Sequence, residues 1–171
     1  MANKLDNIKM LCMDVDGVLT DGGIIIHHDG TESKRFHVHD GGWLRIWGRQ
    51  GLKSAIITGR ECKAVQIRME ALEVDYIYQG AIKKLPVFEQ LLADSGLAPE
   101  EIAYIGDDVF DLPVIRRVGF AATVADGVDE LRKYTDYITH RKGGRGAVGE
   151  LIRYMLKEKE LTEKAMERYM V

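Results

Sequence analysis

The sequence predicts a three-layer α/β fold, in which a mostly parallel, Rossmann-like sheet carries helices on both faces. Short apolar runs alternate with amphipathic segments of helical length along most of the chain. Glycine-rich, acidic turns follow several of these runs, which is typical of the ligand-binding edge of such a sheet. Because 171 residues suit one domain, we expect a single unit over residues 1–171.

The first strand is expected over residues 8–13, an apolar run that ends at Asp14. A β-hairpin then interrupts the alternation over about residues 22–38, with β-type segments at 22–26 and 35–38. Asp29-Gly30 between these segments is a tight-turn signal. The hairpin is an insert too short to form a domain, so the sequence predicts no cap domain.

The remaining elements alternate regularly. An apolar stripe that includes Trp43 and Trp47 predicts a helix over 41–50, which Gly51 ends. Pro86 lies near the start of a helix over 82–93, where proline is tolerated. Further strands are expected at 53–57, 76–78, 102–105, 120–123 and 137–139, and further helices at 62–72, 112–118, 129–134 and from about 147. Residues 157–171 form a charge-rich tail that either continues the last helix or frays.

Composition excludes several classes of protein. Hydrophobic residues make up 46% and charged residues 30%, the balance of an ordinary globular chain. No apolar stretch approaches the roughly 20 residues that cross a bilayer, and acidic residues interrupt the N-terminus before a signal-peptide core. A net charge of −3 argues against a nucleic-acid partner. We therefore expect a cytoplasmic protein with no membrane partner, in which Cys12 and Cys62 are reduced thiols.

Polar side chains follow four successive strands of the predicted sheet. Since the carboxyl ends of parallel strands meet at one edge, we expect these groups to converge. One such cluster would be ordinary turn residues, whereas four in succession indicate a site. In chain order they are Asp14 and Asp16, then Thr58, Gly59 and Arg60, then Lys83 or Lys84, and then Asp107, Asp108 and Asp111.

These residue types suit phosphoryl transfer. Carboxylates held close together repel unless a hard cation neutralises them, and Mg²⁺ prefers oxygen ligands. A lysine and a threonine can neutralise and orient a phosphate group. Asp14 can attack phosphorus to form an aspartyl-phosphate, and Asp16 can serve the leaving oxygen as general acid and then water as general base.

The segment Asp14-Val15-Asp16-Gly17-Val18-Leu19-Thr20 resembles the first motif of the haloacid dehalogenase superfamily of phosphatases. Ile57-Thr58-Gly59, Lys84 and the segment from Gly106 to Asp111 resemble its other three motifs. Aligning Gln79-Gly80 with the family favours Lys84 over Lys83. The resemblance implies Asp14 as nucleophile and Asp16 as acid/base, with Thr58 and Lys84 holding the phosphoryl group. It also implies Mg²⁺ held by Asp14, the backbone carbonyl of Asp16, and Asp107, with Asp108 or Asp111 supporting the metal.

Further motifs resemble one family, the 3-deoxy-D-manno-octulosonate 8-phosphate phosphatases. They are Asp21-Gly22-Gly23, Phe36-x-Val38-x-Asp40-Gly41, Tyr78-Gln79-Gly80 and Gly143-Gly144-Arg145-Gly146-Ala147-Val148. The resemblance implies a capless phosphatase of lipopolysaccharide biosynthesis that acts on a sugar phosphate. It also implies a homotetramer in which the hairpins pack into a central barrel and each subunit covers its neighbour's site.

The same resemblance suggests the substrate-binding residues. Arg60 matches the enzymes for eight-carbon substrates, whereas relatives acting on nine-carbon sugar-acid phosphates carry Glu there; the small Ala71 points the same way. Arg68 would face the sugar carboxylate, and Arg145 either binds that carboxylate or is an ordinary turn residue. The expected substrate-binding set is Asp40, Gly41, Gly59, Arg60, Arg68 and Arg145. A phosphatase for a nine-carbon 2-keto-3-deoxy acid 9-phosphate is the alternative.

Two readings from other classes are weaker. A receiver-like signalling module shares the sheet, the acidic pocket and Mg²⁺, but its phosphorylated Asp follows the third strand. Here that strand ends in Gln79-Gly80. A non-catalytic scaffold would have no reason to retain every acidic and basic element.

Overall fold

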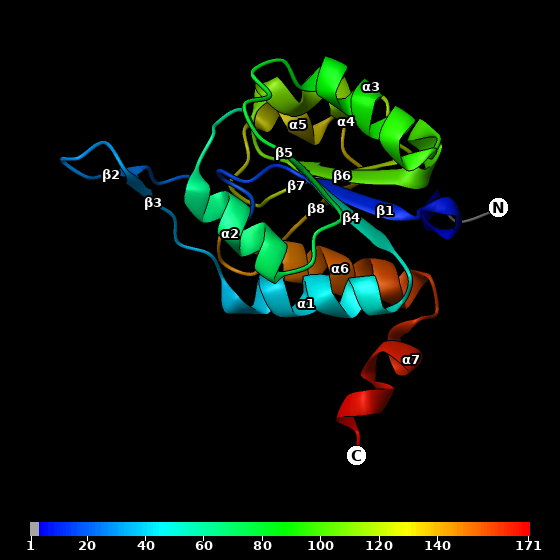
Figure 1. Ribbon diagram of the computed structural model, residues 1–171. Coiled ribbons are helices and arrows are strands. Elements are labelled where there is room, and N and C mark those ends of the chain that lie inside the picture. The colour runs from blue at the N-terminus through cyan, green and yellow to red at the C-terminus, as the bar shows by residue number, and fades with distance from the viewer. Residues whose placement is uncertain (1–3) are drawn as a thin grey trace.

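The computed structural model describes residues 4–171 and contains a six-stranded sheet whose strands are all parallel (Figure 1). β1 lies in the interior of the sheet, between β4 and β6. From one edge to the other the strands are β5 (Tyr76–Tyr78), β4 (Lys53–Ile57), β1 (Met10–Met13), β6 (Ile102–Gly106), β7 (Phe120–Thr123) and β8 (Tyr137–Ile138).

Helices cover both faces of this sheet. α1 (Val38–Arg49), α2 (Lys63–Ala71) and α6 (Ala147–Glu158) lie on one face, and α3 (Lys84–Ser95), α4 (Leu112–Ile115) and α5 (Asp129–Arg132) on the other (Figure 1). Side chains alternate across β1: Leu11 and Met13 join the core under α1, α2 and α6, while Met10 and Cys12 join the core under α3. The predicted three-layer fold is confirmed.

The hairpin insert is shorter than the sequence suggests. Only β2 (Ile25–Ile26) and β3 (Glu32–Ser33) pair, and the hairpin projects from one end of the molecule (Figure 1). The predicted strand at residues 35–38 is wrong, because α1 already begins at Val38. The ring of His37 accepts a hydrogen bond of 3.3 Å from the backbone N–H of His39, and this N-cap starts the helix before the expected Gly41.

The C-terminal tail continues α6 only as far as Glu158. Glu160 takes a left-handed conformation with φ of 55°, and the N–H of Leu161 donates to the carbonyl of Leu156, which ends α6. A separate helix α7 (Thr162–Met166) and the 3-10 turn η4 (Glu167–Tyr169) then run away from the sheet (Figure 1). The other 3-10 turns are η1 (Lys4–Asn7), η2 (Pro99–Glu101) and η3 (Val109–Asp111).

Two further expectations concern the whole chain. Both cysteines are free thiols and buried. Within residues 4–171, none of the helices combines the length and apolar character needed to cross a membrane.

Candidate active site

A cavity of about 330 Å³ opens where β1, β4 and β6 end. The predicted groups from the strand ends converge here, because all these strands run in the same direction. The residues that line the cavity are Asp14, Asp16, Thr58, Gly59, Arg60, Ala81, Ile82, Lys84, Asp107, Asp108 and Phe110.

Asp14 follows β1 directly, and its carboxylate has two partners. Oδ1 accepts a hydrogen bond of 2.7 Å from the backbone N–H of Val15, and Oδ2 lies 2.7 Å from Nζ of Lys84. Burial raises the pKa of Asp14; the charge of Lys84 opposes this effect and that of Asp111 reinforces it. Ion pairing with Lys84 therefore stabilises the anionic form that a nucleophile requires.

Lys84 opens α3 and is only 5% exposed. Its Nζ lies 2.7 Å from Asp14 Oδ2 and 2.6 Å from Asp111 Oδ1. Burial disfavours the ammonium form, but the charges of Asp111 and Asp14 outweigh burial and raise the pKa of Lys84. The preceding Lys83 is the N-cap residue of α3 and does not line the cavity, so geometry selects Lys84 as the lysine of this cluster.

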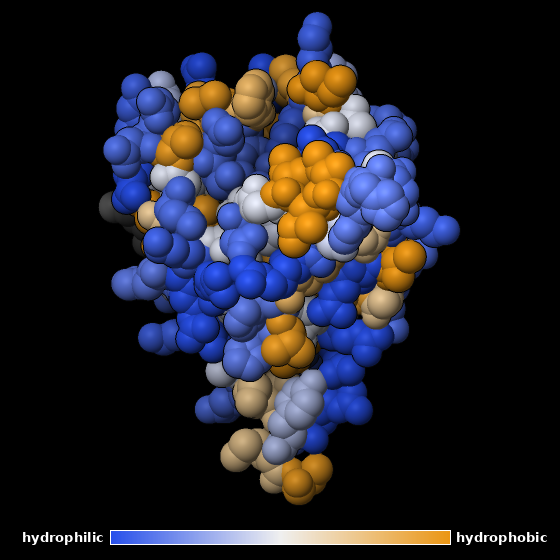
Figure 2. Space-filling model, turned by 90° about the vertical axis from the view of Figure 1, so that its left-hand side faces the viewer, coloured by the Kyte–Doolittle hydropathy of each residue, from blue (hydrophilic) through white to orange (hydrophobic). Residues whose placement is uncertain are grey.

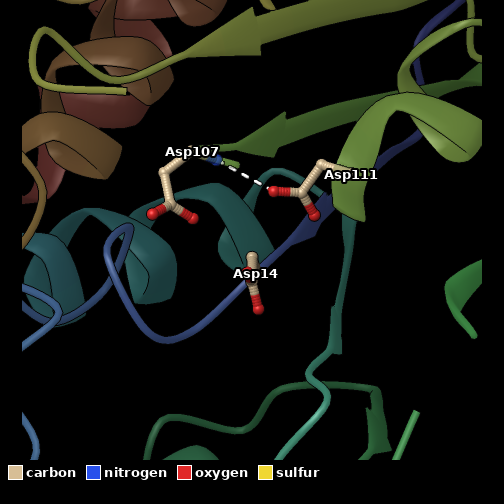
Figure 3. A group of neighbouring side chains, drawn as sticks. All are labelled: Asp14, Asp107 and Asp111. Atoms are coloured by element: carbon tan, nitrogen blue, oxygen red, sulfur yellow. Dashed lines mark hydrogen bonds between the residues drawn. The ribbon is translucent and has the colours of Figure 1, made fainter. Parts of the chain in front are cut away.

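Asp14, Asp107 and Asp111 form an acidic cluster, with one carboxylate oxygen from each lying within 4.8 Å of the others (Figure 3). Both oxygens of Asp111 are already engaged. Oδ1 accepts from Lys84 and Tyr104, and Oδ2 accepts from the backbone N–H groups of Asp107 and Asp108 at 2.9 and 3.2 Å. Asp111 therefore orients the lysine and the loop, and has little capacity left for a metal.

Asp107 differs from Asp111. Its Oδ1 is buried and finds no hydrogen-bond partner among the described residues. Burial, followed by the charges of Asp14 and Asp111, raises the pKa of Asp107 to about 8. An orphaned buried oxygen beside a second carboxylate fits a hard divalent cation, whose charge would remove this repulsion. The donor set that fits Mg²⁺ therefore includes Asp14 and Asp107.

Gly17 allows Asp107 to reach this position. Its φ of +86° is rarely adopted by other residues, and a Cβ there would lie 2.0 Å from Oδ2 of Asp107. The loop after β1, residues 14–21, packs against the glycine loop that precedes α6. The N–H of Gly144 donates to the carbonyl of Val18 at 2.9 Å, and a Cβ on Gly143 would lie 1.7 Å from the carbonyl oxygen of Gly17.

The hairpin contributes charged contacts at the mouth of the cavity. Oδ1 of Asp16 lies 2.5 Å from Nζ of Lys34 and 3.5 Å from Oγ1 of Thr20. Arg60 pairs with Glu32; this hydrogen bond and ion pair raise the pKa of Arg60 and lower that of Glu32. Thr58 lies at the end of β4 and is almost fully buried.

Comparison with known proteins identifies the family. Residues 76–152 match the haloacid dehalogenase-like hydrolase family Hydrolase_3. The chain is 44% identical over 153 residues to the 3-deoxy-D-manno-octulosonate 8-phosphate phosphatase KdsC of Salmonella typhi, covering 90% of this chain and 81% of that protein. The chain belongs to the KdsC phosphatase family.

Solved KdsC structures share the fold over nearly the whole chain. The phosphatase of Moraxella catarrhalis, in complex with a magnesium ion, a phosphate ion and a KDO molecule, has a TM-score of 0.94 at 39% identity and covers 97% of this chain and 95% of its own. The cobalt-bound phosphatase of Haemophilus influenzae has a TM-score of 0.89 at 32% identity, with 92% of each chain covered. These likenesses agree with a capless fold and with an acidic cluster that suits a divalent cation.

Four of the predicted substrate-binding residues do not line the cavity. They are Asp40, Gly41, Arg68 and Arg145. Asp40 is 1% exposed, and its Oδ1 accepts a hydrogen bond of 2.7 Å from the N–H of Gly149 at the start of α6. Arg68 packs against Gly41 and lines a separate cleft between α1 and α2. Exposed Arg145 lies 3.7 Å from Asp21. For these residues, substrate contact stays a prediction.

Two residues that contact the site were not predicted from the sequence motifs: Tyr104 and Lys34. Tyr104 sits inside an apolar strand, and its hydroxyl donates to Oδ1 of Asp111 at 2.6 Å. The one feature of the sequence that could have indicated this role is a hydroxyl group within an otherwise apolar strand. Lys34 comes from a surface hairpin, and nothing in its sequence neighbourhood marks it as a neighbour of Asp16.

Proposed function

We propose that this protein is a Mg²⁺-dependent phosphatase that hydrolyses 3-deoxy-D-manno-octulosonate 8-phosphate to the free sugar acid and phosphate. One observation carries the proposal: buried Lys84 lies against Asp14, beside an oxygen of Asp107 that has no partner within residues 4–171. The carboxylate of Asp14, the ammonium group of Lys84 and a carboxylate of Asp107 that can bind a cation therefore lie together at one cavity, as phosphoryl transfer requires. The kinship with KdsC supplies the substrate class.

In the first half of the reaction, a carboxylate oxygen of Asp14 attacks phosphorus. The bond between phosphorus and the sugar oxygen breaks, its electron pair goes to that oxygen, and Asp16 donates the proton. Lys84 and Thr58 hold the phosphoryl oxygens. Because Lys84 is also fixed by Asp111, it is preorganised and needs no rearrangement as charge develops.

In the second half, a water molecule attacks the aspartyl-phosphate and gives its proton to Asp16. The bond between phosphorus and the Asp14 oxygen breaks, which releases phosphate and restores the carboxylate. Asp14, Asp107 and the backbone carbonyl of Asp16 would hold Mg²⁺. When bound, the ion offsets the carboxylate charges and polarises a phosphoryl oxygen.

The choice of an eight-carbon substrate rests on Arg60, Arg68 and Ala71, of which Arg60 lines the cavity. The side chain of Arg60 lies at the mouth of the cavity, where its guanidinium pairs with Glu32 and has further N–H groups that a sugar carboxylate beyond the phosphate can accept from. Gly59 beside it adds no side chain to the cavity wall. A nine-carbon 9-phosphate remains the second candidate.

The assembly and location form a further part of the proposal. Ile24, Ile25 and Ile26 of the hairpin are 49–66% exposed, an apolar surface that suits contact with other copies of the chain. Figure 2 faces the end from which the hairpin projects and shows apolar groups set among hydrophilic ones. We propose a cytoplasmic homotetramer of one-domain subunits in which Gly41, Arg68 and Arg145 bind substrate. For Asp40, which accepts a hydrogen bond from Gly149, we propose a structural role in place of the predicted substrate contact, and Asp40→Asn tests it.

The deciding experiment measures phosphate release from the eight-carbon 8-phosphate and the nine-carbon 9-phosphate, each with Mg²⁺ or with EDTA. We expect rapid turnover of the eight-carbon substrate that EDTA abolishes. Preference for the nine-carbon substrate would keep the mechanism and overturn the specificity assigned to Arg60, Arg68 and Ala71. Hydrolysis of neither would refute the proposed substrate class. Light scattering of the same sample would test the tetramer.

A further inference from the structure

Lys34 occupies an unusual position for a hairpin lysine. It follows β3, on the segment that projects from the body, yet its side chain is completely buried. Its Nζ lies 2.5 Å from Oδ1 of Asp16 and 3.7 Å from Oε2 of Glu32. Since an ammonium group is costly to bury without anionic partners, these two carboxylates account for its position.

Asp16 has little else to orient it. The other hydrogen bond that the structure shows for its carboxylate is from Thr20, at 3.5 Å, near the limit for such a contact. A charge-assisted contact at 2.5 Å is far stronger than a neutral one at 3.5 Å. The direction in which the Asp16 carboxylate points is therefore determined mainly by Lys34.

The hairpin is in turn attached to the mouth of the cavity at a second point. Glu32 pairs with Arg60, which lies on the loop between β4 and α2, and also faces Lys34. Four alternating charges, Asp16, Lys34, Glu32 and Arg60, thus link the loop after β1, the hairpin and the loop after β4. This chain of ion pairs holds Nζ of Lys34 in place even though its backbone lies on an insert outside the sheet.

We propose that Lys34 is a positioning residue of the phosphatase reaction, which holds the carboxylate of Asp16 in line with the leaving oxygen and, later, with the attacking water. This inference rests on the proposed function, because it takes Asp16 as the acid/base. It gives the hairpin a role inside its own subunit, separate from any contact with other copies.

The principal test compares Lys34→Met with wild type on the sugar 8-phosphate. Methionine keeps most of the side-chain length and removes the charge. Since general acid/base catalysis contributes about 10²–10⁴-fold, its partial loss should lower kcat by about 10- to 100-fold with little change in KM. Lys34→Arg should recover most of the loss. A raised KM with normal kcat would overturn the proposal, because it would mean that Lys34 contacts substrate instead.

A second readout separates positioning from general damage. With p-nitrophenyl phosphate the leaving group needs no proton, whereas hydrolysis of the aspartyl-phosphate still needs Asp16 as base. Lys34→Met should therefore release nitrophenolate in a rapid burst, followed by slow turnover. Equal slowing of burst and turnover would contradict a role through Asp16.

Two matched variants complete the design. In an Asp16→Asn background, Lys34→Met should cause little further loss, because the two residues act through the same proton transfer. Arg35→Met removes the neighbouring hairpin cation, whose partner is Asp21, and should keep near-normal kcat. Full additivity, or an equal loss from Arg35→Met, would overturn the proposal. If wild type hydrolyses p-nitrophenyl phosphate but not the sugar phosphate, only the substrate assignment fails.

Discussion

Two regions of the molecule bury carboxylates and differ in what surrounds them. At the carboxyl edge of the sheet, Asp107 faces Asp14 and Asp111, and one of its oxygens has no partner within the described part of the chain. Between α1 and α6, burial also raises the pKa of Asp40, and its Oδ2 likewise has no hydrogen-bond partner among residues 4–171. The neighbours differ, however: Oδ1 of Asp40 accepts from the N–H of Gly149, and the nearby charges are those of His37 and Arg141, which lower the pKa, instead of further carboxylates that raise it.

This difference separates a ligand site from a structural cap. Repulsion among carboxylates at the sheet edge remains until a cation binds, so that region is poised for a ligand. The carboxylate of Asp40 instead satisfies a free N–H at the start of α6, as a capping side chain does, but from a neighbouring helix. Burial and a raised pKa do not by themselves distinguish the two functions.

The largest effect is expected from Asp14→Asn. The amide cannot serve as the nucleophile, so turnover should fall by at least about 10⁴-fold. The thermal midpoint should hold or rise, because the substitution removes repulsion with Asp107 and little packing volume. Steady-state phosphate release and a thermal melt would check both outcomes. Turnover within tenfold of wild type would refute Asp14 as the nucleophile.

Metal binding should stabilise the sheet edge in a pH-dependent way. The raised pKa values of Asp14 and of Asp107, the latter at about 8, mean that the folded protein retains protons that the unfolded chain releases above about pH 4. Without metal, these groups therefore lower stability as pH rises from about 4 to 8. Mg²⁺ binds the deprotonated carboxylates, so its stabilisation should be greater at pH 8 than at pH 5.5.

At 100 times its dissociation constant a ligand contributes about 2.7 kcal/mol, or about 5–10 °C in Tm for a chain of this size. Thermal melts with Mg²⁺ or EDTA at the two pH values would measure this difference. Asp107→Asn is the matched control and should lose most of the Mg²⁺-dependent increase. An equal increase in that variant would exclude Asp107 as a ligand.

The smallest effect is expected at the structural cap. Asp40→Ala should lower the free energy of unfolding by about 1–2 kcal/mol, since it leaves the N–H of Gly149 without this acceptor. Asp40→Asn keeps an acceptor oxygen and should recover much of that stability with near-normal kcat/KM. A large rise in KM for Asp40→Asn would instead support substrate contact and would remove the contrast between the two regions.

Much of the catalytic edge was predictable. Asp14, Thr58 and Asp107 each follow a parallel strand, and parallel strands end together, so their convergence needs no knowledge of side-chain packing. The start of α1 was not predictable in the same way. Alternating residues before Gly41 suggested a strand, but the cap formed by His37, four residues before Gly41, starts a helix there instead.

The sequence by itself determined the α/β class, the order of strands and helices, and the acidic, hydroxyl and lysine groups at the sheet edge. These depend on periodicity and on chain direction, which are local properties. Tertiary structure alone decided that Asp111 contacts Lys84 while Asp107 keeps an oxygen with no partner in the described part of the chain, and that Lys34 reaches Asp16 from the hairpin. Such pairings depend on distances between segments far apart in the chain, and residue spacing carries no information about those distances.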